Sequence, residues 1–309
     1  MLRSGGLVAF PTETVYGLGA DATDAHAAAR IYEAKGRPSF NPLIAHVPDL
    51  AAAQREGVFD AAALTLARAF WPGPLTLVVP VAPGGTVSEL SRAGLESVGL
   101  RVPSHPVAQA LLRAVGRPVA APSANRSGHV SPTSAAHVLA DLDGRIDAVL
   151  DGGDSAVGLE STIVACLEGT VTLLRPGAIT RGDLAAALGR DVATAADDDA
   201  HAPQSPGRLA AHYAPATPVR LDATAVPPGA LLLAYGPALP AGAERARVVH
   251  NLSQLGNPVE AAANLYAALR FLDSLGGDAI FVARIPQTGL GEAINDRLRR
   301  AAIGSTLGN

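Results

Sequence analysis

The chain has very little cysteine and few aromatic residues, and the shortage of cysteine excludes one class of protein. Of 309 residues one is Cys and 4% are aromatic. A lone cysteine excludes a disulfide framework, which fits a reducing cytoplasm. Cys166 lies in the apolar run 162–167, which predicts a buried strand residue and not a nucleophile or a metal ligand. No apolar run approaches the ~18 residues of a membrane span, and the first residues lack the layout of a signal peptide. We therefore expect a cytoplasmic protein that does not contact membranes.

Lysine is also almost absent. Lys35 is the only lysine among 24 basic residues, so arginine replaces it wherever chemistry allows. An ammonium is a compact point charge, whereas a guanidinium is a broad planar fork, so position 35 predicts contact with a small reacting anion. Arg37 supplies the fork that suits phosphate. Residues 35–42 therefore predict a rigid anion-binding loop, with a solvated helix end as the alternative because cations are favourable there.

The chain is long enough for two domains, and its charge argues against a nucleic-acid protein. Its formal net charge is −4, so no general basic field attracts RNA or anionic lipid. We predict a first domain over 1–190, a linker or lid over 191–217 and a smaller α/β domain over 218–309. The linker is acidic and proline-rich, but Ser205-Pro206-Gly207-Arg208 and His212-Tyr213-Ala214-Pro215 have more turn and aromatic residues than a spacer needs.

Apolar runs and helical spacing alternate along both halves. In the first half they predict strands near 7–10, 43–47, 75–79, 97–103, 119–121, 148–150, 161–166 and 171–174, with helices at 24–35, 60–70, 106–115 and from 131–133. In the second half they predict strands at 230–235, 247–252 and 279–285 and helices at 258–274 and 291–302, which is typical of a parallel, Rossmann-like sheet.

Cations and hydroxyls follow several of these strands. The cations are Lys35, Arg37, Arg101 and Arg175, and the hydroxyls are those of Thr12, Thr14, Ser123 and Ser161. Arg101 stands in an apolar strand, so we expect its charge to point to solvent or to a bound anion. Four cations with many small donors suit a triphosphate and a second anionic substrate. There is no Walker A sequence, no zinc spacing and no Ser/His/Asp order with a supporting context.

Several ordered motifs resemble the Sua5/YrdC/YciO family, and the longer Sua5 branch most closely. They are Pro11 to Leu18, Lys35-Gly36-Arg37-Pro38 with Asn41-Pro42-Leu43, Pro122 to Asn125, Glu160-Ser161-Thr162, Arg175-Pro176-Gly177 and the two linker motifs. The resemblance implies a YrdC-like twisted mixed sheet around a concave cationic cavity, followed by the smaller C-terminal domain. It also implies a nucleotidyltransferase, an L-threonylcarbamoyladenylate synthase that joins L-threonine, bicarbonate and ATP and releases pyrophosphate for the t6A37 modification of tRNA.

The resemblance also assigns roles to residues at matching positions. Lys35 and Arg37 would be catalytic, with Lys35 near the carbamate and phosphates and Arg101 binding the threonine carboxylate. Threonine would be surrounded by Thr14, His46, Arg101, Ala121 and Ser161. ATP would be held by Arg37, Asn41, Ser97, Ser123, Ser131, Arg175 and Tyr213. Ala121 stands where a hydroxyl is common, so its contact would be through the backbone.

The resemblance implies Mg²⁺ as a companion of ATP, held by no protein side chain. The product would pass to a tRNA threonylcarbamoyl-transferase complex, and direct tRNA binding would be weak or absent. Two alternatives remain open: a double-stranded RNA-binding module of the YrdC type, and a carbamoyl-transfer module of the hydrogenase-maturation kind. The net charge of −4 argues against the first, and the second belongs in a longer chain with zinc-finger segments.

Overall fold

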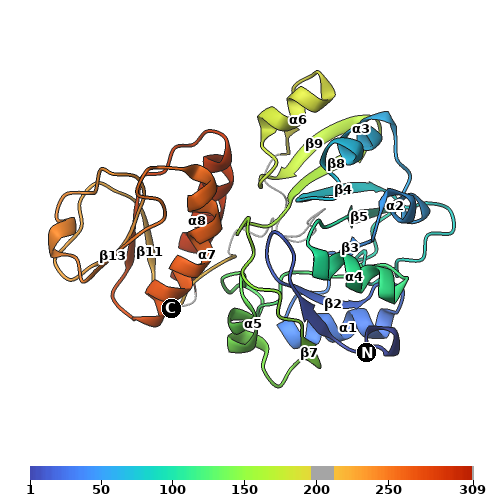
Figure 1. Ribbon diagram of the computed structural model, residues 1–309, viewed down its shortest axis with the longest axis horizontal. Helices are drawn as coiled ribbons and strands as arrows, with labels where there is room; N and C mark the ends of the chain where they lie inside the picture. Colours follow the sequence, from blue (N-terminus) through green and yellow to red (C-terminus); the bar gives the residue numbers. More distant parts are fainter. Residues whose placement is uncertain (196–211, 308–309) are drawn as a thin grey trace. The chain divides into compact units, whose positions relative to one another are not determined.

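The computed structural model describes residues 1–195 and 212–307, which form two compact units. The first unit contains Met1–Ser127, Pro132–Ala156 and the described residues from Glu160 to 195. The second contains Gly128–Ser131, Val157–Leu159 and residues 212–307. Each unit has its own sheet (Figure 1). No helix in the described ranges is long and apolar enough to cross a membrane.

The first unit is built on one twisted mixed sheet of ten strands (Figure 1). Their order is β10-β9-β8-β4-β5-β3-β6-β2-β1-β7. The strands are β1 Val8–Phe10, β2 Gly17–Asp21, β3 Ile44–His46, β4 Leu75–Pro80, β5 Ser97–Arg101, β6 Val119–Ala120, β7 Ala148–Val149, β8 Thr162–Leu167, β9 Thr170–Arg175 and β10 Ala193–Thr194. The sheet contains both parallel pairs, such as β3 with β5, and antiparallel pairs, such as β4 with β5. The predicted mixed α/β sheet is confirmed.

Helices pack mainly on one face of this sheet. They are α1 Ala25–Lys35, α2 Leu50–Glu56, α3 Ala61–Phe70, α4 Pro106–Val115, α5 Ala135–Leu142 and α6 Arg181–Leu188, after a 3-10 turn at Leu2–Ser4. Side chains alternate along a strand, so Leu77 and Val79 of β4 join the large core with Ile31 and Leu66 from α1 and α3. Val78 points to the other face, into a smaller apolar cluster with Ile44 and Ile163. The candidate site lies on that second face.

One local expectation needs correction, and two helices were missed. The helix expected from 131–133 begins at Ala135, because Ser131 precedes a proline and Ser134 is the residue whose hydroxyl accepts from the backbone N–H of His137. The helices α2 and α6 were not predicted, although Asp49 caps the first and Thr180 forms a capping box with Asp183 in the second. Both are short and carry too few apolar residues to show a helical period.

The second unit has four strands, and all of its pairings are parallel. The order is β11-β14-β12-β13, with β11 Val219–Ala223, β12 Leu231–Ala234, β13 Val248–Asn251 and β14 Ile280–Ala283. The helices are α7 Pro258–Ser274 and α8 Leu290–Leu307, with a 3-10 turn at Ala243–Arg245. Sequence analysis located every one of these strands except β11, whose alternating polar residues break the apolar run.

Candidate active site

A row of side chains crosses the second face of the first sheet and forms the floor of the candidate site. His46 at the end of β3 is the register partner of Arg101 at the end of β5. Arg101 is in turn opposite Thr76 of β4, and Thr76 is opposite Ile163 of β8. Residues that are partners across strands point to the same face. The register therefore brings His46, Arg101 and Thr76 side by side, although they are far apart in sequence.

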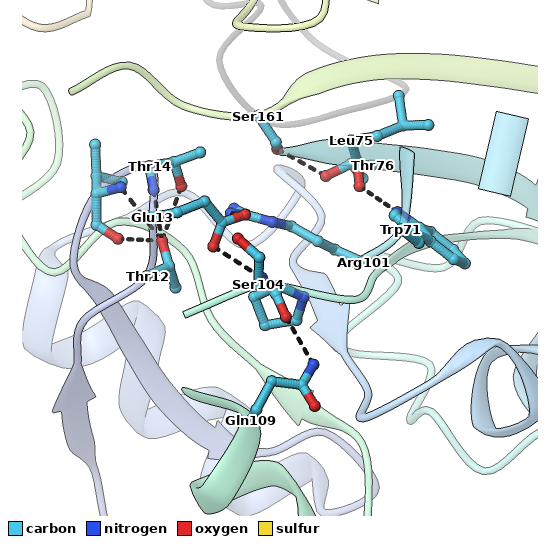
Figure 2. Close-up of polar contacts among 12 residues, drawn as sticks. Thr12, Glu13, Thr14, Trp71, Leu75, Thr76, Arg101, Ser104, Gln109 and Ser161 are labelled. Atoms are coloured by element: carbon cyan, nitrogen blue, oxygen red, sulfur yellow. Dashed lines mark hydrogen bonds and ion pairs between the residues drawn. The ribbon is translucent and has the colours of Figure 1, made fainter. Parts of the chain in front are cut away.

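Sequence analysis expected Arg101 to point to solvent or to a bound anion, and in the structure it is paired with a carboxylate of the chain itself. Its Nη2 donates to Oε1 of Glu13 at 2.7 Å, and the backbone N–H of Ser104 donates to Oε2 at 3.1 Å (Figure 2). The two charged side chains are 5% and 11% exposed. Burial alone would raise the pKa of Glu13, but the charge and hydrogen bonds of Arg101 outweigh it and hold that pKa below its ordinary value.

The pairing with Glu13 still leaves part of Arg101 available. Its Nε is buried and has no hydrogen-bond partner among the described residues. A buried guanidinium N–H without a partner costs free energy unless an acceptor reaches it. Glu13 therefore fixes the orientation of the guanidinium while one donor remains for a further anion.

The loop after β1 contributes hydroxyls to the same place. The hydroxyl of Thr12 donates to the carbonyl of Val15 at 2.6 Å and lies 2.8 Å from the hydroxyl of Thr14 (Figure 2). Both threonines are almost fully buried. A backbone hydrogen bond also fixes the end of the loop, because the N–H of Tyr16 donates to the carbonyl of Pro132. The loop over residues 12–16 is thus stabilised by hydrogen bonds of its own side chains.

Ser161 connects this row to Arg175. Its hydroxyl lies 2.7 Å from that of Thr76, and its carbonyl accepts from Nε and Nη2 of Arg175 at 3.1 and 2.9 Å (Figure 2 shows the first contact). Sequence analysis missed Thr76, because a threonine inside an apolar strand carries no local signal. Only the register with Arg101 places it in the site.

Lys35 is the last residue of α1. The alternative of a solvated helix end was therefore right that Lys35 ends a helix, but wrong that its side chain is solvated. Gly36 ends the helix with φ +61°, and the Lys35 side chain is buried. Its Nζ donates to the carbonyl of Ser123 at 2.6 Å and to that of Asn125. Burial first, and then the charge of Arg37, lower the pKa of Lys35 well below its ordinary value. The ammonium is thus held between α1 and the loop after β6.

Arg37 and Asn41 close the loop that follows α1. Arg37 is buried, and its Nε and Nη2 donate to the carbonyls of Asn41 and Pro42 at 3.3 and 3.0 Å. Asn41 is buried as well, and the hydroxyl of Tyr32 also donates to its carbonyl, at 3.2 Å. The predicted rigidity of residues 35–42 therefore comes from side chain to backbone hydrogen bonds as well as from proline.

His46 is a neutral, fully buried member of the row. Burial, and next the positive charge of Arg101, lower its pKa to about 3. Its Nδ1 lies 3.2 Å from the carbonyl of Ile44, and its ring meets that of Phe10 edge-on at 6.3 Å between centroids. A neutral imidazole can accept a hydrogen bond from a ligand without adding charge. Ala121, also buried, uses its backbone N–H to bond the carbonyl of Ile44.

Not all predicted site residues come together. Ser97 is at the opposite end of β5 from Arg101, about 13 Å away along a strand. It lines a small pocket with Thr76 and Ile44, on the same face as Arg101. Ser131 and Tyr213 belong to the second unit. The motif Ser205-Pro206-Gly207-Arg208 lies outside the described residues.

Two further findings concern metal and thiol chemistry. Within residues 1–195 and 212–307 no group of three or more His, Cys, Asp or Glu side chains could hold a metal ion. Cys166 is buried in β8 as predicted, and burial, assisted by the charge of Asp60, raises the pKa of its thiol to about 12. A thiol with so high a pKa is a poor nucleophile at neutral pH.

Comparison with known proteins identifies the family. Residues 1–177 match the Sua5/YciO/YrdC family, described as "Telomere recombination", and residues 179–303 match the "Threonylcarbamoyl-AMP synthase, C-terminal domain". The chain is 42% identical to the threonylcarbamoyl-AMP synthase of Bacillus subtilis, covering 99% of this chain and 92% of that one. It is 39% identical to that of Pyrococcus abyssi over 97% of this chain and 92% of the relative.

Solved structures agree with this result. The crystal structure of P. abyssi Sua5 complexed with L-threonine superposes with a TM-score of 0.88 and 37% identity, covering 98% of this chain and 92% of that one. The sequence resemblance is thus confirmed along both units. The chain belongs to the Sua5/YciO/YrdC family, in the long form that carries the Sua5 C-terminal domain.

Proposed function

We propose that this protein is an L-threonylcarbamoyladenylate synthase, a nucleotidyltransferase that makes threonylcarbamoyl-AMP and pyrophosphate from L-threonine, bicarbonate and ATP. The observation that carries the proposal is the similarity to threonylcarbamoyl-AMP synthases over 97–99% of the chain. The buried cations and hydroxyls of the first unit support it, because they suit two anionic substrates. The same residues are the basis for proposing a concave cationic cavity, and the four parallel strands of the second unit are the basis for calling it Rossmann-like.

We assign the threonine subsite to the row on the sheet. Arg101 would bind the carboxylate through its free Nε, with Glu13 holding the guanidinium from the other side. Around the amino acid, Thr14, Ser161 and neutral His46 would accept or donate hydrogen bonds, and Ala121 would contribute backbone. The methyl group of threonine is worth only ~1–3 kcal/mol in such a pocket, whereas a missing hydroxyl leaves a buried partner unpaired and costs more. We therefore expect threonine to be preferred over both serine and valine.

We assign the ATP subsite to the loops around Lys35. Arg37, Asn41, Ser123 and Arg175 come from the first unit, and Ser97 extends the same face of the sheet. Ser131 and Tyr213 are included on the family resemblance. Lys35 would lie near the carbamate and the phosphates. Burial lowers the pKa of Lys35, and an arriving phosphate would favour its ammonium form.

The reaction needs positioning more than it needs a protein nucleophile. The threonine amine adds to CO2 derived from bicarbonate and loses a proton, which gives a carbamate. A carbamate oxygen then attacks the α-phosphorus of ATP in line, and pyrophosphate leaves. Lys35, Arg37 and Arg175 would stabilise the charge that develops on the phosphate oxygens. Mg²⁺ would enter with the triphosphate of ATP as part of the substrate.

The intermediate would pass to a tRNA threonylcarbamoyl-transferase complex in the cytoplasm, with weak or absent direct binding of tRNA. A lid over 191–217 that excludes water remains part of the proposal, because a carbamate and an acyl-adenylate both hydrolyse readily. Its test is the rate of protease cleavage in 191–217, which should fall only when ATP and threonine are present together.

The activity is tested by mass spectrometry of the products after incubation with ATP, Mg²⁺, bicarbonate and one amino acid at a time. Threonine should yield the adenylate and an equal amount of pyrophosphate, and serine and valine much less. EDTA should abolish both products. Equal yields from the three amino acids would contradict the assigned pocket, and tight, salt-sensitive RNA binding without ATP turnover would support the RNA-binding alternative.

A further inference from the structure

A second pocket lies in the first unit, apart from the candidate active site. It has a volume of about 720 Å³ and is lined by residues of α2, of the end of α4 and of the segments next to β2 and β6. Figure 1 shows α2 and α4 close together in this unit. Val47 lines the pocket, while the preceding residue, His46, belongs to the active-site row. Neighbouring residues of an extended segment point to opposite sides, so the side chain of Val47 faces away from the active-site row.

Three guanidinium groups surround this pocket. Arg55 comes from the last turn of α2, Arg113 from the last turn of α4, and Arg117 from the segment that leads into β6. All three residues are exposed, in contrast to the buried arginines of the active site. Arginine side chains that reach one cavity from separate elements can bind a phosphate group from more than one side.

The carboxylates near the pocket are already occupied by internal donors. Oδ1 of Asp21 accepts from the N–H and the hydroxyl of Thr23, and Oδ2 accepts from Nη1 of Arg117 at 2.9 Å. Glu56 accepts from the N–H and the hydroxyl of Thr86 and from the N–H of Val87. Neither acid pairs with Arg55 or Arg113 in these contacts. Three arginines therefore stand against two carboxylates, which leaves the rim with an excess of positive charge.

Helix capping does not account for Arg113. A cation near a helix C-terminus is often explained by the last carbonyl groups. In α4 that role is filled by Arg3, whose Nε and Nη2 donate to the carbonyls of Val115 and Ala114 at 2.8 and 2.7 Å. The side chain of Arg113 lines the pocket instead.

The walls of the pocket indicate which kind of anion fits. Apolar surface comes from Val47, Pro48, Leu112 and Pro118. The volume is within the ~300–1,000 Å³ that small-molecule sites occupy, so a bare phosphate ion would leave most of the wall without a partner. A planar base against the apolar wall and a phosphate at the guanidinium rim would use both features, and the hydroxyls of Thr23 and Thr86 have lone pairs that can accept from a base or a ribose.

We propose that this pocket is a second ligand site, separate from the active site, that binds a nucleoside phosphate through Arg55, Arg113 and Arg117. It goes beyond the proposed function, because nothing in the adenylation step requires a nucleotide there. A ligand at this position would contact Val47, the residue that follows His46 at the end of β3.

Calorimetric titration of the full chain with GMP, CMP and UMP, each alone, tests the proposal, and AMP is left out because the proposed ATP subsite would also bind it. At least one should bind wild-type protein with a Kd below about 1 mM and bind at least about tenfold more weakly to Arg55→Glu and to Arg113→Glu. Arg68→Glu is the matched control, because Arg68 is an exposed arginine in the last turn of α3 and does not line the pocket. It should bind like wild type.

Three results would overturn the proposal: no binding of any monophosphate, binding that survives both charge reversals, or inorganic phosphate binding as tightly as the nucleotides. Adenylate formation, measured on the same variants, should remain within about twofold of wild type, since these exposed charges are not part of the active site. The two proposals therefore fail independently: loss of nucleotide binding leaves the synthase assay unchanged, and absence of synthase activity leaves the titration interpretable.

Discussion

The two groups of cations in the first unit differ in how their charges are compensated. In the active site, Lys35, Arg37, Arg101 and Arg175 are between 3% and 8% exposed and donate to backbone carbonyls or to Glu13. In the second pocket, Arg55, Arg113 and Arg117 are exposed. Buried cations depend on shape and on each of their partners, whereas exposed cations contribute charge that water can screen. The predictions below test this difference.

Exchanging lysine and arginine should change the rate of adenylate formation most where the cation is buried in the active site. Lys35→Arg retains the charge, but a guanidinium does not fit between α1 and the carbonyls of Ser123 and Asn125. We expect the rate of adenylate formation to fall at least about 100-fold, corresponding to roughly 2.7 kcal/mol. Arg113→Lys, the same exchange in reverse at the exposed pocket, should leave this rate unchanged. Equal rates for Lys35→Arg and wild type would show that the single lysine is accidental.

Removal of one ion-pair partner should also separate buried from exposed charges. Glu13→Gln leaves Arg101 charged and buried, so the free energy of unfolding should fall by about 3 kcal/mol. Arg117→Gln breaks a pair whose arginine is 53% exposed, and should cost about 1 kcal/mol or less. Urea denaturation followed by circular dichroism measures both values.

Glu13→Gln also tests the positioning of the guanidinium. A loss of orientation should raise the KM for threonine more than the KM for ATP, which a general loss of stability would not do. Comparable changes in both constants would mean that Glu13 serves stability alone.

The pH dependence of stability should reveal buried His46. Its folded pKa of about 3 is below the ordinary 6.5, so between these values the unfolded state binds the additional proton. Stability should therefore fall as pH decreases from 6.5, by up to about 1.4 kcal/mol per pH unit from this group. His46→Asn should flatten the curve between pH 6.5 and 4.5.

Glu13 should add a second, lower transition. Its pKa is lowered, so its contribution to stability is present above the unfolded value of about 4.5 and is lost as pH falls further. In Glu13→Gln the loss of stability below about pH 4.5 should be smaller. The loss of stability between pH 6.5 and 4.5, which comes from His46, should remain. A curve unchanged by both substitutions would contradict the burial argument.

The smallest effect is expected at Cys166. Its raised pKa and burial in β8 mean that iodoacetamide should not label native protein at pH 8, and that it should label protein unfolded in urea. Cys166→Ala should keep full activity. Fast labelling of the native state would show that β8 opens readily.

Much of this protein was determined by the sequence alone. Motif order pointed to the family, and apolar periodicity located most strands and the helices α4 and α7, because long amphipathic patterns survive in almost any tertiary context. The scarcity of lysine singled out Lys35, whose burial was then found in the structure. The chemical character of the site, cations with hydroxyls, was readable because these residues lie at the ends of strands and helices and in the loops beside them.

The partners of those residues were decided by the tertiary structure. Thr76 entered the site only through the register of β4 with β5, and Glu13 was recognised only where it meets Arg101, 88 residues away in sequence. The second pocket joins α2, α4 and the strand ends, which no local pattern connects. Sequence periodicity reports which face of one element is apolar, whereas an ion pair or a pocket depends on which elements become neighbours, and that is set by packing of the whole sheet.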